Sequence, residues 1–227
     1  TAPTVAQVAV HDTVSSIVLP LGSVFGLAVI VLSLWLTWRQ ARRQQSLRVP
    51  LLTALAGLLI AVAAMPYARV SFNRPLSMIN TLSVVEAEKV IHSLLKNVYR
   101  SFDFRDESDV YDKLAVSVQG DLLEDIYLQN RKSFAVKKAG GAQARVQEVD
   151  ILEARAETLA SAGNGFAVKA KWTAQGTVGH WGHVHIRKNY YDAVVNLQIR
   201  EGYWKIIGLE LVEEKRLEPY AQPELSE

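Results

Sequence analysis

The chain contains an uncharged, apolar run from residue 17 to residue 38, and this run constrains its fold more than any other feature. A helix of about 22 residues at 1.5 Å per residue covers about 33 Å, close to the hydrocarbon thickness of a bilayer. Trp35 and Trp38 stand together at its end, where an interfacial aromatic belt would place them. The alternative is a helix buried in a soluble domain, but an uncharged run of this length seldom fits inside so short a chain. We therefore predict a transmembrane helix here.

A second uncharged run follows at residues 49–67, near the lower length limit for a membrane span. Small residues recur along it at helical spacing: Ala54, Gly57, Ala61 and Ala64. Such a face lets a neighbouring helix approach closely. Together the two runs predict a transmembrane helical hairpin over residues 17–67.

The loop between the runs, residues 39–48, carries no acidic residue. Its arginines are Arg39, Arg42, Arg43 and Arg48. By the positive-inside rule this loop stays in the cytoplasm, so both termini face the other side. We expect a two-pass protein of a bacterial-type inner membrane, with residues 1–16 as a short outer tail. Because the chain starts at Thr1 and not at Met, we also expect a signal peptide cleaved before Thr1, although a sequence that starts late would look the same.

Beyond a linker at residues 68–82, the sequence takes on a helical period. Ser83 and Glu86 fit a capping box, and apolar residues three and four apart predict a first helix up to about residue 102. A polar, acidic break precedes a second predicted helix at residues 107–117. A third predicted helix, at residues 121–138, ends before two glycines.

After the third helix the apolar period changes to two, which is typical of strands with one face in water. Three stretches alternate in this way: residues 144–158, 166–178 and 191–199. Glu201-Gly202 predicts a tight hairpin turn into a last strand at residues 203–213. Three helices followed by about four antiparallel strands predict an α+β domain over residues 83–216, with residues 217–227 as an extended C-terminal tail.

The last predicted strand carries Gly202, Trp204, Lys205 and Ile206 in a G-x-W-K-I pattern. With the order of helices and strands before it, residues 83–216 resemble the nuclear transport factor 2-like superfamily, also called SnoaL-like or cystatin-like. The resemblance implies a cone in which a bent four-stranded sheet wraps around three helices, often with a pocket. Some relatives are enzymes, and many are dimerisation or assembly modules, including periplasmic domains of inner-membrane machines. No catalytic motif of the enzyme members maps onto this chain.

Three histidines, His180, His183 and His185, fall within six residues of one another in a glycine-containing loop. Neutral imidazole is a good ligand for zinc and copper, and a site needs about three such ligands. The loop is therefore a candidate Cu or Zn site. A loop that contacts a partner protein, or one with no role beyond connecting two strands, explains the same residues.

A pocket in the predicted cone would be apolar, and we expect Trp172, Tyr190 or Tyr191 to line it. These aromatic residues could equally be ordinary core. The acidic residues between positions 103 and 112 are explained by the start of a helix as well as by acid–base chemistry. No serine-centred elbow, phosphate loop or dinucleotide-binding glycine pattern is present in the sequence.

The composition narrows the classes of function. With 25 Lys+Arg and 23 Asp+Glu, the net charge of +2 does not favour a nucleic-acid-binding protein. The absence of cysteine excludes disulfides, thiol nucleophiles and cysteine-based metal sites. We expect a non-catalytic, membrane-anchored accessory or assembly subunit of a larger inner-membrane complex. Its partners would be integral membrane proteins, contacted through the hairpin and through a periplasmic docking domain. The alternatives are a periplasmic protein that handles Cu, Zn or a small ligand and, last, an enzyme that uses the cone pocket.

Overall fold

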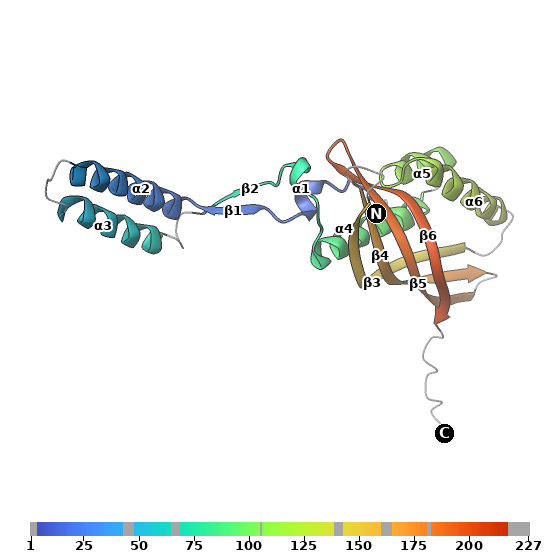
Figure 1. The fold of residues 1–227 in the computed structure, drawn as a ribbon. Helices are drawn as coiled ribbons and strands as arrows, with labels where there is room; N and C mark the ends of the chain where they lie inside the picture. Colours follow the sequence, from blue (N-terminus) through green and yellow to red (C-terminus); the bar gives the residue numbers. More distant parts are fainter. Residues whose placement is uncertain are drawn as a thin grey trace, which may run out of the picture. The chain divides into compact units, whose positions relative to one another are not determined.

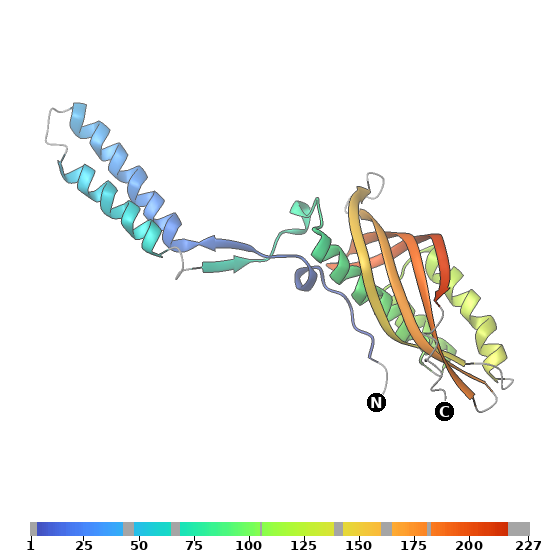
Figure 2. The same ribbon diagram turned by 90° about the horizontal axis from the view of Figure 1, so that it is seen from below.

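A computed structural model describes residues 4–42, 48–64, 69–104, 106–138, 143–159, 165–180 and 183–217. The chain divides into two compact units, shown in Figures 1 and 2. One unit consists of Ser15–Arg74, and the other joins Thr1–Val14 to Pro75–Glu227. The second unit is an α+β domain with a four-stranded antiparallel sheet, in agreement with the predicted fold class.

The smaller unit is a pair of helices, α2 (Leu21–Arg42) and α3 (Arg48–Ala64), that run side by side (Figure 1). Two short strands, β1 (Ile17–Pro20) and β2 (Arg69–Phe72), pair antiparallel at the stem of this hairpin. Strand β1 occupies the start of the run that we predicted to be helical throughout, because Pro20 has no N–H group to donate within a helix.

One helix in the described part of the chain, Val24–Arg42, is long and apolar enough to cross a membrane or to act as a signal sequence. Only 11% of the apolar stretch of this helix is buried, which differs from a helix in the core of a soluble domain. The apolar part of α3, Leu52–Ala63, is shorter than that length. The prediction of two full spans is therefore supported for the first span only.

The two helices approach closely where they carry small residues. A methyl group added at Gly26 would clash with the Cβ atom of Ala61, and one added at Gly57 would lie 2.9 Å from a methyl of Val29. Further along, the hydroxyl oxygens of Ser33 and Thr53 are 3.0 Å apart. The small-residue face predicted for the second helix thus contacts the first helix at Gly57 and Ala61.

We expect Gly26→Leu to force α2 and α3 apart, because no side chain fits between Gly26 and Ala61. Since the chain has no cysteine, Ser33→Cys with Thr53→Cys provides a reporter of the helix contact. Oxidation should form this cross-link in the parent and lose it with Gly26→Leu. The control is Ala28→Leu, at an exposed position of the same helix, which should leave the cross-link intact. Equal cross-linking in all backgrounds would contradict the close packing.

The sheet of the larger unit contains β3 (Gln143–Leu159), β4 (Gly165–His180), β5 (His183–Arg200) and β6 (Tyr203–Leu217), in that spatial order. Register shifts interrupt the pairing of β3 with β4 and of β5 with β6, twice in each pair. Bulges of this kind increase bending and twist, and the sheet is strongly curved (Figures 1 and 2). The predicted hairpin turn is confirmed, with Glu201 at φ 52° and Gly202 at φ 84°, as a two-residue type I′ turn requires.

Helices cover one face of this sheet. They are α4 (Val84–Ser101), α5 (Glu107–Ala115) and α6 (Asp121–Lys138), and a short 3₁₀ turn, η1 (Leu76–Met78), precedes them. The predicted capping box opens α4, since Ser83 and Glu86 each accept a hydrogen bond from the other's backbone N–H. Apolar residues of α4 meet the inward residues of β4 and β5 in one core, whose fully buried members include Val90, Ile91, Leu94, Phe166, Val168, Leu197 and Trp204.

Residues 4–14, which we call the N-terminal strap, are packed onto this domain. We expected a short outer tail here, but Val8 and Val10 are buried and a short helix, α1 (Val10–Thr13), forms. The strap pairs with the start of β6. The Val10 N–H donates to the Gly202 carbonyl at 3.0 Å, and the Trp204 N–H donates to the Val8 carbonyl at 2.9 Å.

A side-chain hydrogen bond completes this contact. The indole N–H of the fully buried Trp204 donates to the hydroxyl of Thr13 at 2.8 Å. On the other side, the Asn97 amide of α4 donates to the Ala6 carbonyl at 2.7 Å. The strap is therefore held by β6 and by α4, and it forms part of the folded domain.

Thr13→Val should destabilise the domain by about 1–3 kcal/mol, because the buried indole N–H of Trp204 loses its acceptor. Urea unfolding in detergent, followed by tryptophan fluorescence, measures the change. Thr81→Val removes a hydroxyl at an exposed position and serves as the control. If the two variants unfold at the same urea concentration, the strap does not stabilise the domain.

Candidate functional site

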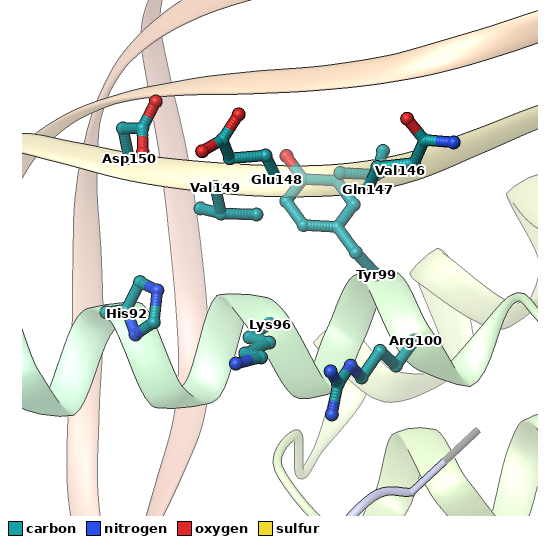
Figure 3. A pocket seen from close by; sticks show the side chains of 9 residues that line it. All are labelled: His92, Lys96, Tyr99, Arg100, Val146, Gln147, Glu148, Val149 and Asp150. Atoms are coloured by element: carbon teal, nitrogen blue, oxygen red, sulfur yellow. The ribbon is translucent and has the colours of Figure 1, made fainter. Parts of the chain in front are cut away.

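A cleft of about 210 Å³ separates α4 from β3 (Figure 3). Three basic side chains, His92, Lys96 and Arg100, lie along α4 at intervals of four residues and so share one face of the helix. Glu148 and Asp150 of β3 line the opposite wall. Figure 3 shows the carboxylates of Glu148 and Asp150 directed away from α4, and the Asp150 carboxylate lies 3.6 Å from the Lys188 ammonium, so the acidic groups do not face the basic ones across the cleft. Among the described residues that line this cleft, only Tyr99 carries a hydroxyl group.

A second cleft, of about 310 Å³, opens on the inner face of β4 and β5, and we call it the inner cleft. Val146 lines both clefts, so the two are neighbours. The residues around the inner cleft are Arg145, Val146, Ala174, Gly176, Thr177, Val178, Arg187, Asn189, Tyr191 and Glu214. The lining is therefore a mixture of cationic, amide, phenol and carboxylate groups with a few apolar side chains.

A chain of hydrogen bonds orders one wall of the inner cleft. The Arg187 Nε–H donates to the Asn189 amide oxygen at 3.0 Å. The Asn189 amide nitrogen in turn donates to the Tyr191 hydroxyl at 3.0 Å and to a Glu214 carboxylate oxygen at 3.1 Å. Because each polar group has a partner, this wall is preorganised, and a ligand would meet groups already held in place.

Beneath this wall lies an aromatic group. The Trp172 and Tyr191 rings stack with centroids 5.3 Å apart, and the Trp172 indole N–H donates to the Tyr99 hydroxyl at 3.2 Å. Burial raises the pKa of Tyr99 to about 12, although the hydrogen bond from Trp172 works in the opposite direction. Burial also raises the pKa of Tyr191. Both phenols therefore stay protonated near neutral pH and do not serve as bases there.

The three aromatic residues predicted for a pocket lie in three different environments. Tyr191 lines the inner cleft, whereas Trp172 is only 3% exposed and lies in the core behind it. Tyr190 points to the opposite face of the sheet, because side chains alternate along a strand. Arg187 and Asn189 also line the inner cleft and were not predicted from the sequence, although the same alternation, counted back from Tyr191, places both on the inner face.

The histidine loop lies largely outside the described residues. His180 and His183 end β4 and β5 and pair through their backbones, but Trp181, Gly182 and the side chains of both histidines are not described. His185 is exposed and pairs with Val178. In the described part of the chain, no group of three His, Cys, Asp or Glu residues could hold a metal ion. The Cu or Zn site therefore stays a prediction.

The loop predicted at residues 39–48, which we call the arginine loop, also lies partly outside the described residues, which omit Arg43. At the end of α2, the Arg39 guanidinium lies 5.4 Å from the centroid of the Trp35 ring, and that of Arg42 lies 3.9 Å from Trp38. Cation–π pairs of this kind are suited to a membrane interface, where an aromatic ring is half buried and a charge stays hydrated.

Alkaline unfolding tests the buried phenol. The pKa of Tyr99 is about 12 in the folded chain against 10.0 ordinarily, so the unfolded chain releases this proton first as the pH rises. The free energy of unfolding should therefore fall between pH 10 and pH 12, by up to about 1.4 kcal/mol per pH unit from this group. Tyr99→Phe should cost about 1 kcal/mol at pH 8, because Trp172 loses its acceptor, and should show a shallower alkaline decline.

Urea unfolding at pH 8 and pH 11 measures both effects, with Tyr111→Phe, at an exposed position on α5, as the matched control. A Tyr99→Phe protein that loses as much stability as the parent between these pH values would contradict the assignment of this proton to Tyr99.

Comparison with known proteins gives no family for the chain. No protein-family model matches it, and no curated protein is significantly similar to it.

Proposed function

We propose that this protein is a non-catalytic, membrane-anchored accessory or assembly subunit of a larger inner-membrane complex, with an extracytoplasmic domain that docks a partner protein. The observation that carries the proposal is the place of the helical hairpin in the chain. Ser15–Arg74, with its apolar helices, is inserted between the strap and the rest of a domain to which the strap is hydrogen-bonded. A membrane anchor is thus built into the domain and is not merely attached to one end of it.

This arrangement supports a two-pass topology. The strap and β6 are joined by backbone hydrogen bonds, so residues 4–14 and 75–217 must share one side of the membrane. If α2 crosses the bilayer, the chain has to return before Pro75, and α3 is the segment that can return it. With 17 residues, α3 covers about 26 Å, slightly less than a typical hydrocarbon core. The arginine loop then lies in the cytoplasm, and both termini lie outside.

The surface of the hairpin supports its insertion into lipid. Apolar residues are exposed along both helices. More than half of the surface of each of the following residues is exposed: Leu27, Val31, Leu34, Leu59 and Val62. Soluble monomers rarely expose so continuous an apolar surface. In a bilayer the same side chains face lipid tails, while the polar contact between Ser33 and Thr53 is kept between the helices.

The docking surface that we propose is the outer edge of β6. The strap covers this edge at Trp204, and the Ile206 N–H donates to the Ser117 carbonyl. From residue 209 to residue 217, the described part of the chain supplies no backbone partner on that side. Leu209, Leu211 and Val212 are exposed there. An open strand edge with exposed apolar side chains is suited to pairing with an extended segment of another protein.

A second candidate function is the handling of a small ligand, and the inner cleft favours it. Asn189, Tyr191 and Glu214 form a preorganised polar wall above an aromatic floor, as a binding pocket for a small molecule requires. The curved sheet with helices on one face also supports, as a proposal, the resemblance to the nuclear transport factor 2-like superfamily, whose members often carry a pocket. A histidine-based metal site would be a further variant of this second function.

Cysteine labelling tests the topology, since the natural chain has no cysteine. Val85→Cys, at an exposed position on α4, should react with a membrane-impermeant maleimide on intact spheroplasts. Ser46→Cys, in the arginine loop, should react only after the membrane is opened. Labelling of both sites from outside would contradict the two-pass topology.

Isolation of the complex in a mild detergent from native membranes tests the docking function. A stoichiometric integral membrane partner should accompany the parent chain. Leu211→Lys should reduce its recovery by an order of magnitude, because charge on an exposed strand edge opposes strand addition. Leu152→Lys, at an exposed position on the opposite edge strand β3, is the control and should retain the partner. A chain that is isolated alone, or equal loss of the partner in both variants, would overturn this docking surface.

A further inference from the structure

The paired strands β1 and β2, which we call the ribbon, have two unlike faces. Side chains alternate along each strand, and opposite residues of an antiparallel pair share a face. The register pairs Ile17 with Phe72 and Leu19 with Val70, so one face carries four apolar side chains. The other face carries Val18, Pro20, Arg69 and Ser71.

The apolar face is uncovered in the unit that contains the ribbon. Ile17 is 40% exposed, Leu19 is 43% exposed and Phe72 is 51% exposed, while Val70 is half-buried. An isolated two-stranded ribbon is at best marginally stable in water. A ribbon with one wholly apolar face therefore needs an apolar environment on that side in order to persist.

The length of α2 indicates the depth of this ribbon. Leu21 follows Pro20 directly, so no linker separates the ribbon from the helix. The stretch of α2 from Leu21 to Trp38 rises about 27 Å, whereas the hydrocarbon core is about 30 Å thick. With Trp38 and Arg42 at the cytoplasmic interface, the ribbon begins where the hydrocarbon meets the outer headgroups.

The backbone of the ribbon excludes a deeper position. The outer edges of a two-stranded ribbon carry backbone N–H and C=O groups that the ribbon itself cannot pair, and such groups need water or other polar partners. The headgroup layer supplies these partners, and the acyl chains below it offer an apolar surface.

We infer that the ribbon lies in the headgroup layer of the outer leaflet, with Ile17, Leu19, Val70 and Phe72 toward the acyl chains. The ribbon is then an interfacial anchor that holds the two stems of the hairpin together at a fixed depth. This inference rests on the proposed insertion of the hairpin into the membrane. The occupant of the apolar face is the lipid itself, because Leu21, which follows the ribbon directly, and Val24 and Phe25 beyond it are exposed apolar residues of α2.

Site-directed spin labelling of the full chain in liposomes of phosphatidylcholine and phosphatidylglycerol tests this inference. Single cysteines replace Ile17, Leu19 or Phe72 on the apolar face and Val18 or Ser71 on the opposite face. The ratio of collisions with oxygen to collisions with a water-soluble nickel chelate should be at least about threefold higher on the apolar face. A thermal unfolding curve identical to that of the unlabelled chain confirms that each labelled protein is folded.

Leu34→Cys, in the middle of α2, separates failure of this inference from failure of the proposed function. If the Leu34 site faces lipid while both ribbon faces collide equally with the nickel chelate, the ribbon lies in water and the inference is wrong. If the apolar face is shielded from both reagents, protein covers it, and the inference is again wrong. If the Leu34 site itself is exposed to water, the hairpin is not inserted and the proposed membrane anchor fails.

Discussion

The contact between the strap and the first residues of β6 is the interaction on which the arrangement of this molecule depends. Two backbone hydrogen bonds and the bond from Trp204 to Thr13 tie the start of the described chain to its last strand. Residues 15–74 therefore form a segment inserted into the larger domain, and both ends of this segment connect to that domain. In the proposed membrane topology the second helix brings the chain back across the bilayer, and the tight contact of Gly26 with Ala61 shows how the two helices pack.

In the larger unit, the curvature of the four-stranded sheet determines where the core and the inner cleft lie. The register shifts bend the sheet, so that β4 and β5 form a hollow over the helices instead of a flat layer. Large side chains such as Phe166 and Trp204 fill most of that hollow and form the core. Toward one end the lining turns polar, with Asn189 and Glu214, and the hollow remains open there. Core and cleft are thus two parts of one concave surface, which differ only in the residues that line them.

The sequence predicted those features that depend on local pattern. The capping box at Ser83 and the turn at Glu201-Gly202 are each specified within a few residues, and both are confirmed. The strap could not be predicted, because Val8 and Val10 are buried by β6, nearly two hundred residues later in the chain, and no local period marks them. The lining of the inner cleft could be predicted only in part. Alternation correctly separates Tyr190 from Tyr191, but the pairing of Tyr191 with Glu214 depends on the register between strands, and bulges shift that register.

The strap has a consequence for the order in which the molecule is made. Thr13 and Trp204 are separated by 191 positions, so the strap has no strand to join until β6 has been synthesised. Under the proposed membrane topology, the closing contact forms only when the strap and β6 lie on the same side of the membrane. Contacts between such distant residues form slowly, because the long loop must close before they yield any stabilisation. If the hairpin inserts into a membrane as proposed, closure of the strap requires both helices to cross it, because a chain in which only one helix crossed would leave the strap and β6 on opposite sides.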